Sequence, residues 1–357
     1  MMNGIQSKII GADKSDQIGK ILVLVYLILF ICFLIFPLFA LMSKSMQNTD
    51  GVFVGFENFA AYLNEPNLFN SFFHSQFVAI ISTIVVVFLG FLYAFALHCT
   101  CMPLKGFFRV VALIPLLSPS ILAAIALVYW FGNQGVVKEV LMGYSIYGPI
   151  GIIMASVYWT FPHALMILST SLSLSDARLY EASEVLKATK FRTFVTVTIP
   201  GAKYGIISTT FVVFILVFTD FGVPKVIGGN YNVLATDIYR EVVGMQNFQM
   251  GAVISIVLLI PALLAFALDQ YFRKRQSSQL TSRAVVFAPK PHKSRDNFFL
   301  TYCLLITILV FLMLGMAQYG ALVKFWPYNL NLTLSHYNFE VAGLGWDSFY
   351  NSVRMSL

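Results

Sequence analysis

The chain has 357 residues, of which 58% are hydrophobic, 15% aromatic and only 11% charged. A soluble domain carries about 25% charged residues, and a disordered chain combines low hydrophobicity with high charge. The composition therefore excludes both classes and indicates a polytopic membrane protein, whose net charge of +7 has to be explained by where its basic residues lie.

Seven segments are long and apolar enough to cross a bilayer, which takes about 20 residues. They are residues 21–41, 77–97, 110–131, 150–174, 201–221, 242–268 and 297–323. The first follows a polar stretch and has the length of a full span, so we expect an uncleaved helix rather than a signal peptide.

The basic residues are distributed unevenly between alternate loops. If the N-terminus lies inside, 17 of the 23 Lys and Arg residues fall on the inner side. Lys and Arg accumulate in cytoplasmic loops. The sequence therefore predicts a multi-pass protein of the bacterial inner membrane with a cytoplasmic N-terminus, and the charge gives no reason to expect a nucleic-acid partner.

No catalytic or cofactor motif is present in the sequence. His98, Cys99 and Cys101 are too few for a zinc site, which takes four ligands, and no second cluster exists. The patterns H-E-x-x-H, G-x-S-x-G and G-x-x-x-x-G-K-[ST] are all missing, so we expect neither an enzyme nor a chain that binds ATP itself.

The order of apolar and polar stretches predicts four parts. An N-terminal tail, span and outer segment (1–69) precede a core of membrane spans (70–272), a basic linker (273–297) and the start of a second, incomplete unit (298–357). Asn70-Ser71 and Asn351-Ser352 stand at equivalent places before a span, which suggests a repeat. Transporters are often built from two such halves, so we expect a longer protein with a second unit.

The loop between the fourth and fifth spans is unusually long beside its short neighbours on the inner side. Asp176 is placed to cap a helix over residues 177–187, and Pro200 is placed at the start of the fifth span. The loop at 181–200 is therefore expected to form a short helix, a turn and a second short segment at the membrane surface.

This loop resembles the EAA loop of the permeases of binding-protein-dependent ABC importers. That pattern is Glu-Ala-Ala, three residues, Gly-Ala, and then Ile/Val-x-Leu/Ile-Pro at a fixed distance. The chain matches it at Glu181, Ala182, Ala188, Val197, Ile199 and Pro200. It departs from the pattern at Ser183, where the family has Ala, and at Lys187, where the family has Gly.

The resemblance covers residues 70–272 and implies an all-α fold, the type I ABC importer transmembrane domain. A six-helix unit would be followed by the first helix of a second repeat. The loop would dock on a cytoplasmic ATPase, with Glu181 offering a carboxylate and the small Ala182 and Ser183 allowing close approach. A surface helix held by lipid alone is the alternative. A non-glycine residue with positive φ at Lys187 would cost about 1 kcal/mol.

The implied partners are two ATPase subunits that carry ATP and Mg²⁺, a periplasmic solute-binding protein, a second permease unit and the bilayer. The chain itself would bind no cofactor. An ion-coupled secondary transporter is a more distant alternative, because that class needs ionisable groups at membrane depth and this chain offers only His163 and Asp220.

The segment after the fifth span resembles fused permeases for 2-aminoethylphosphonate, and ferric-iron permeases share its Asp-Phe-Gly and Leu-Ala-Thr patterns. We therefore expect 2-aminoethylphosphonate as the cargo, with ferric iron or another small solute as the alternative. His163 either lines a pathway or bonds a carbonyl freed by Pro162, and Asp220 acts at a helix end or a gate. The candidate pathway or gate residues are Asp220, Lys225, Asn230, Tyr231 and His163.

Overall fold

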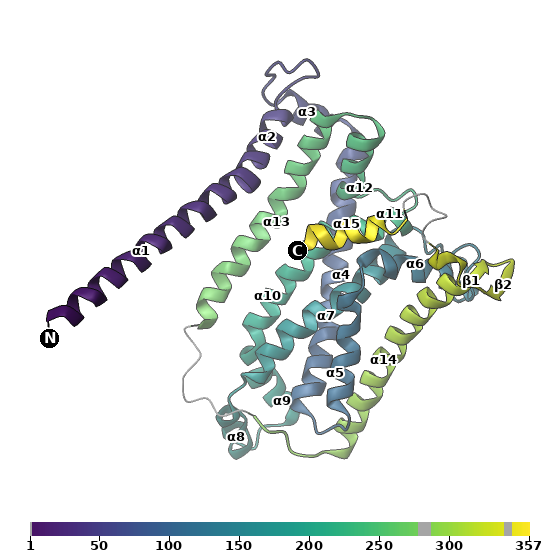
Figure 1. The fold of residues 1–357 in the computed structure, drawn as a ribbon. Coiled ribbons are helices and arrows are strands. Elements are labelled where there is room, and N and C mark those ends of the chain that lie inside the picture. The colour runs from purple at the N-terminus through teal and green to yellow at the C-terminus, as the bar shows by residue number, and fades with distance from the viewer. Residues whose placement is uncertain (1, 278–286, 339–344) are drawn as a thin grey trace. The chain divides into compact units, whose positions relative to one another are not determined.

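The computed structural model describes residues 2–277, 287–338 and 345–357, and most of them are helical (Figure 1). Within these ranges six helices are long and apolar enough to cross a membrane, and a seventh span is possible by length as a bent pair. The chain divides into two compact units, Met1–Phe69 with Asp237–Leu259, and Asn70–Thr236 with Ile260–Leu357.

The first unit contains the N-terminal span. Helix α1 (Met2–Phe30) passes through a π turn (Ile31–Ile35) into α2 (Phe36–Ser45), so the span is one continuous helix. A short turn then leads to α3 (Glu57–Asn64). The Asn58 amide closes that turn by donating to the carbonyls of Ser45 and Gln47, both at 2.9 Å.

The rest of the first unit holds buried charges that are paired with each other. A π turn (Arg240–Gly244) follows α12 (Leu234–Tyr239) and precedes α13 (Phe248–Ser277). Arg240 lies 3.2 Å from Asp237 and 3.4 Å from Glu241. Both carboxylates are almost completely buried, which is tolerable only because a cation accompanies them.

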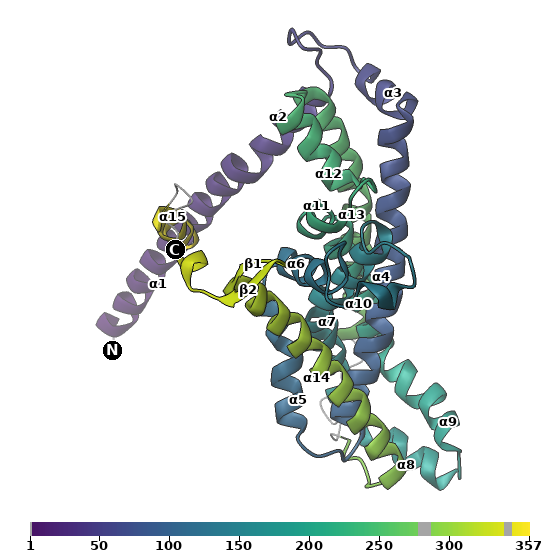
Figure 2. The ribbon, with the colours of Figure 1, turned by 90° about the vertical axis from the view of Figure 1, so that its right-hand side faces the viewer.

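The second unit contains the remaining helices (Figures 1 and 2). They are α4 (Pro66–Cys99), α5 (Lys105–Leu113), α6 (Ser120–Phe131), α7 (Pro149–Ser173), α8 (Ala177–Val185), α9 (Lys190–Thr193), α10 (Ile199–Phe218), α11 (Gly222–Ile227), α14 (Lys293–Leu322) and α15 (Asp347–Ser356). Short 3-10 turns lie at Ile114–Leu117, Lys138–Leu141 and Ser335–Tyr337. A small antiparallel pair of strands, β1 (Val323–Phe325) and β2 (Asn329–Leu332), was not expected of an all-α chain.

The core of the second unit lies where α7 packs along α10. Gly205 of α10 lies directly against Ser171 of α7, leaving no room for a Cβ atom. Small residues allow such close approach between membrane helices. Tyr93 of α4 packs edge-on against Phe161 of α7 at 5.5 Å, and its hydroxyl donates to the Phe108 carbonyl of α5 at 2.9 Å.

The third predicted span, residues 110–131, is not one straight helix. Its two halves, Lys105–Leu117 and Ser120–Phe131, meet at 99°. Ser118 and Pro119 between them are extended, with ψ of 144° and 151°. A residue before proline is driven out of the helical region, so the bend follows from Pro119, which the apolar run concealed.

Two other predicted spans begin at different residues. The fifth span continues from α9 through a π turn (Phe194–Thr198) into α10, so it starts at Lys190 rather than at residue 201. Pro200 is therefore inside a continuous helix. The Ile199 N–H closes the wide turn on the Phe194 carbonyl, and the next residue, Pro200, has no N–H to place. The sixth span starts at Phe248 and not at residue 242.

The predicted linker, residues 273–297, is shorter than expected. Helix α13 continues to Ser277, and α14 already begins at Lys293, where the ring of His292 caps it by accepting from the Arg295 N–H at 3.4 Å. Lys, Arg and Gln are good helix formers, which explains the extension of α13. Residues 278–286 of the linker lie outside the described residues.

The seventh span, α14, packs along the second unit at three levels. Tyr302 donates to the Leu89 carbonyl of α4 at 2.8 Å, and Trp130 of α6 donates to the Leu312 carbonyl at 3.2 Å. Beyond the end of α14, Trp326 donates to the Gln134 carbonyl at 3.1 Å. The helix predicted to begin a second repeat is thus bound to the core of the first, and the four-part division itself stays a prediction.

Two glycines of α10 form a matched test of the α7–α10 packing. A Cβ at Gly205 would overlap Ser171, whereas nothing lies within 4 Å at Gly201. Alanine favours a helix by about 1 kcal/mol over glycine, so Gly201→Ala should preserve or raise the thermal midpoint in detergent. Gly205→Ala should lower stability by about 1–3 kcal/mol. Equal shifts for the two variants would contradict this packing.

Candidate functional site

The loop that matched the EAA pattern folds into two helical segments joined by a tight turn. It lies at the end of the second unit where α14 begins, as both views show (Figures 1 and 2). Helix α8 is capped as predicted, because the Asp176 carboxylate accepts from the Arg178 N–H at 3.1 Å. The second segment begins with Thr189, whose hydroxyl accepts from the Arg192 N–H at 3.3 Å.

Lys187 adopts the conformation for which the family pattern uses glycine. Its φ is +53°, and it directly follows the last turn of α8. The Ala188 N–H donates to the Ser183 carbonyl at 3.0 Å, and the Lys187 N–H donates to the Glu184 carbonyl at 2.9 Å. These two bonds form a Schellman motif, which ends a helix on a left-handed residue. The lysine therefore occupies a strained position that glycine would adopt freely.

The two segments of the loop are held together by hydroxyl groups. The hydroxyls of Ser183 and Thr193 lie 2.6 Å apart, and the Tyr180 hydroxyl donates to that of Thr198 at 3.1 Å. Ser183 is buried within the loop. The interpretation that Ser183 faces a partner is therefore wrong, because its side chain points to the second segment, a contact that the family's alanine would not make.

A cluster of exposed apolar side chains lies on and beside α8, and we call it the apolar tip. Its members are Leu179, Val185, Leu186 and Phe191, with exposed fractions of 55, 81, 80 and 77%. Ala182 and Glu181 are exposed beside them. The sequence analysis missed these four residues. Large apolar residues in a loop rich in Lys and Arg were the signal that could have indicated them.

The remaining pattern residues lie in the turn after α8 and around the start of α10. Ala188 is half-buried, Val197 and Ile199 are half-buried in the π turn and the start of α10, and Pro200 is exposed. Val197, Ile199 and Pro200 lie within a continuous helix, whereas Ala188 lies in the turn before it. Their contribution is therefore to the direction in which the loop leaves the membrane helix.

A cavity of about 560 Å³ lies behind α8, between the loop and residues 287–295. Aromatic and apolar side chains line part of it, and Glu181, Glu184, Lys190 and Lys290 contribute charge. The Lys290 ammonium lies 2.8 and 2.7 Å from the two oxygens of Glu184. Its hydrogen bond and charge hold the pKa of that carboxyl below its ordinary value.

Asp220, predicted at a helix end or a gate, lies at the start of α11. Its carboxylate accepts from the Val223 N–H at 3.0 Å and from the Ser120 hydroxyl of α6 at 2.9 Å. The group is half-buried between the two helices, and burial raises its pKa above the ordinary value. Asp220 thus joins α11 to the N-terminus of the bent α6.

The other four predicted pathway residues do not gather in one place. Tyr231 stacks on His74 with ring centroids 3.9 Å apart, while Lys225 and Asn230 are exposed. His163 lies edge-on against Trp159 in its own helix, with centroids 5.8 Å apart. None of these residues lines the cavity behind α8. Their role in a pathway stays a prediction.

The described residues contain no group of three or more His, Cys, Asp or Glu side chains that could hold a metal ion. Cys99 and Cys101, adjacent in the sequence to His98, carry free thiols. The Cys101 thiol donates to the Pro289 carbonyl at 3.1 Å. Its observed contact is thus with the chain's own backbone.

Residues 102–278 match the protein family described as binding-protein-dependent transport system inner membrane component. This part of the chain is similar to the members of that family. The matched residues include the loop at 181–200, which carries the EAA-like pattern, and also α11. Together with the apolar helices it identifies a multi-pass inner membrane protein.

Individual relatives support the same family. The chain is 28% identical over 281 residues to the ferric transport system permease protein FbpB of Actinobacillus pleuropneumoniae, covering 75% of this chain and 40% of that protein. It is 28% identical to the putative ferric permease FbpB 1 of Haemophilus influenzae, covering 75% and 43%. The spermidine/putrescine permease PotB of Escherichia coli is 26% identical, covering 56% and 75%. The chain thus spans about two fifths of the ferric relatives.

Solved structures confirm the predicted fold class. A bacterial alginate ABC transporter in complex with a pentasaccharide-bound periplasmic protein aligns with a TM-score of 0.56 at 16% identity, covering 76% of this chain and 98% of that chain. A second alginate ABC transporter structure gives the same TM-score at 14% identity, covering 75% and 98%. The second unit and its flanking helices therefore have the fold of an ABC importer transmembrane domain.

Lys187 provides a test of the Schellman turn. Lys187→Gly should stabilise the end of α8 by about 1 kcal/mol, because glycine adopts positive φ without the Cβ clash. Slower hydrogen exchange of the Lys187 and Ala188 amides would report this. Lys187→Ala removes the same charge but keeps the Cβ, so it should not slow exchange. Similar slowing in both variants would mean that charge, and not backbone strain, is responsible.

Proposed function

We propose that the chain is the permease component of an ATP-driven, binding-protein-dependent importer, and that α8 is its docking helix for the ATPase. The apolar tip carries this proposal. Leu179, Val185 and Leu186 are exposed on and at the end of a short helix outside the candidate spans, and Phe191 is exposed at the start of the next one. Such side chains require a partner surface to leave water. Their position in the family segment 102–278 supports the ATPase as that partner.

The proposed docking uses one face of α8. Leu179, Ala182 and Leu186 lie on that face, since residues three and four apart in a helix are neighbours. Ala182 contributes little bulk, so the helix backbone can approach the partner closely. Glu181, exposed on α8 and contributing to the lining of the cavity behind it, would pair with a basic group of the ATPase. ATP and Mg²⁺ would be bound by that subunit, and hydrolysis would occur there.

The proposed mechanism is a rigid-body movement. Closure of two ATPase subunits would pull a docking helix on each permease unit and tilt the membrane helices to alternate access. One such loop lies in this chain, so the second would come from a second permease unit, either a further part of the same protein or another copy. A periplasmic solute-binding protein would deliver cargo to the side opposite the loop, with the N-terminus in the cytoplasm.

Two cargoes are proposed. The relatives named for ferric transport favour ferric iron. The other proposal is 2-aminoethylphosphonate, which rests on the resemblance of residues 219–239 alone. Tyr231 and the stacked ring of His74 offer donor atoms of the kind that ferric iron prefers. Lys225 and Asn230 offer the cation and the donor that a phosphonate would need.

Leu186 tests the apolar tip. Burying a leucine is worth about 1.5–3 kcal/mol, so Leu186→Ser should weaken binding of the purified ATPase subunit about tenfold or more. Leu334 is a matched control, because it is 72% exposed against 80% for Leu186 and lies outside the loop. Leu334→Ser should leave binding unchanged. Equal effects of the two substitutions would contradict docking through α8.

Glu181 tests the role of charge on α8. Glu181→Ala should reduce co-purification of the ATPase while the protein still inserts into the membrane. Glu139 is exposed on the 3-10 turn Lys138–Leu141, far from α8 in sequence, and Glu139→Ala is the control. Unchanged co-purification and unchanged transport in Glu181→Ala would remove the carboxylate from the docking role.

Uptake by intact cells tests the whole proposal. Labelled ferric iron and labelled 2-aminoethylphosphonate would be supplied separately, with the proton gradient collapsed while ATP is maintained. We expect uptake of one of them to continue, because ATP supplies the energy. Uptake that stops with the gradient would instead identify an ion-coupled secondary transporter.

A further inference from the structure

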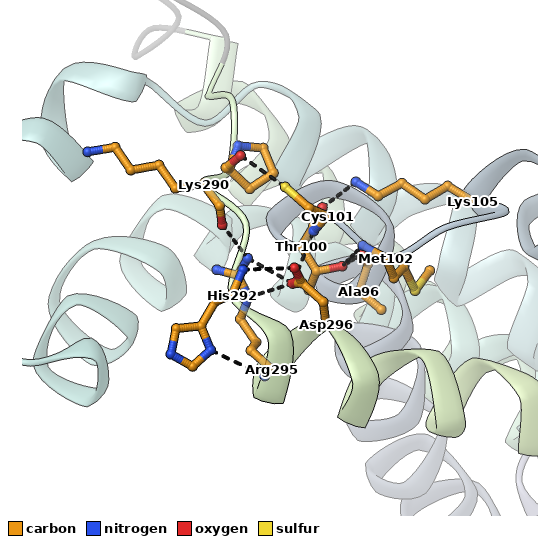
Figure 3. Close-up of polar contacts among 10 residues, drawn as sticks. Ala96, Thr100, Cys101, Met102, Lys105, Lys290, His292, Arg295 and Asp296 are labelled. Atoms are coloured by element: carbon orange, nitrogen blue, oxygen red, sulfur yellow. Dashed lines mark hydrogen bonds and ion pairs between the residues drawn. The ribbon is translucent and has the colours of Figure 1, made fainter.

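Residues 287–296, which lead into α14, are fastened to the rest of the second unit, and we call them the strap. The sequence predicted them as part of a basic linker between two membrane units. In the structure they contact the chain that follows α4 at one end (Figure 3) and α8 at the other. The strap therefore lies between the proposed docking helix and the span that follows it.

The root of the strap is the buried carboxylate of Asp296, in the first turn of α14. It accepts from the Cys101 N–H at 3.1 Å and from the His292 N–H at 2.9 Å. The Arg295 guanidinium adds two bonds, at 3.0 and 2.9 Å (Figure 3). Hydrogen bonds to a charged group are stronger than neutral ones. This network fixes the start of α14 to the chain that follows α4.

The middle of the strap is held through its backbone. The Arg295 guanidinium donates to the Lys290 carbonyl at 2.7 Å, and the Cys101 thiol donates to the Pro289 carbonyl at 3.1 Å. Lys105 donates to the Thr100 carbonyl beside them (Figure 3). The residues between α4 and α5 thus form a base on which the strap lies.

The far end of the strap contacts α8 through an aromatic and an ionic contact. The ring of Phe287 stacks on Tyr180, with centroids 3.9 Å apart and planes at 22°. Lys290 pairs with Glu184 at 2.7 Å. Tyr180 and Glu184 are four residues apart and share one face of the helix. The exposed ion pair is weak by itself, but it fixes the register of the stacked rings.

The strap and the proposed docking face use opposite sides of α8. At 3.6 residues per turn, Leu179, Ala182 and Leu186 lie on the side of the helix away from Tyr180 and Glu184. A partner on the apolar tip would not have to displace the strap. A second connection runs beside it, because Phe95 of α4 contacts Phe194 of the π turn at 5.6 Å and Phe299 of α14 at 5.2 Å.

We propose that the strap is a positioning element that moves with the docking helix and carries its displacement directly to α14. This inference rests on the proposed function, because it takes α8 to be pulled by an ATPase. Phe287 and Lys290 are then positioning residues: they touch neither cargo nor nucleotide, and they determine how far α14 follows α8. Release of the strap on docking, as an inhibitory contact would require, is the contrary behaviour.

Cross-linking measures whether strap and loop move together. Glu184→Cys and Lys290→Cys would be combined in the full-length protein with the four native cysteines changed to Ser, a change that preserves a donor at position 101. The rate of cross-linking by a short bifunctional thiol reagent would be compared without nucleotide and with ATP and vanadate. Rates that agree within about twofold are expected. A rate that falls about fivefold or more in either state would overturn the proposal.

Substitution measures whether the strap matters for coupling. In the Phe287→Ala/Lys290→Ala double variant we expect ATPase binding and ATP hydrolysis to persist while cargo transported per ATP falls about fivefold or more. Lys293→Ala is the control, since Lys293 is an exposed strap lysine that is not one of the two residues described in contact with α8. An unchanged ratio, or loss of ATPase binding in the double variant, would overturn a coupling role.

The two experiments separate failure of this inference from failure of the proposed function. If no ATPase binds the unmodified protein, the proposed function fails, and the coupling role falls with it. If the ATPase binds and drives uptake but the cross-linking rate depends on nucleotide, only the strap inference fails.

Discussion

The structure depends on one constraint, that the bilayer offers no water to backbone N–H and C=O groups. Every such group has to bond within the protein, which leaves long helices as the regular element and makes each interruption need its own solution. At the bend between α5 and α6, two prolines remove donors, and the Ser118 hydroxyl donates to the Pro115 carbonyl at 2.9 Å. Before Pro200, a π turn provides the adjustment.

The same constraint explains why polar chemistry is concentrated at the ends of helices. Asp220 bonds across from α11 to α6, and Asp296 bonds at the start of α14. Each carboxylate is surrounded by donors where two helices meet. Carboxylates in such positions join elements that could otherwise slide, which is what the proposed rigid-body movement would require.

The docking loop combines order inside with apolar exposure outside. A helix cap, a Schellman turn and two hydroxyl contacts fix its backbone, so little conformational entropy remains to be lost on binding. The strap supports it from behind. A preorganised helix with an unsatisfied apolar face on one side and a fixed connection to α14 on the other is suited to transmit a pull.

The sequence by itself determined the membrane class, the approximate spans and the loop with its capping residue and its positive-φ lysine. These follow from local patterns: apolar length, the Asp176 cap and the family's glycine position. The tertiary structure alone decided that Ser183 faces inward, that Leu186 and its neighbours face outward, and that residues 287–296 bind α8 and the chain after α4. The contacts of residues 287–296 join residues about 100 to 200 positions apart, and no local periodicity encodes which distant side chain a helix face will meet.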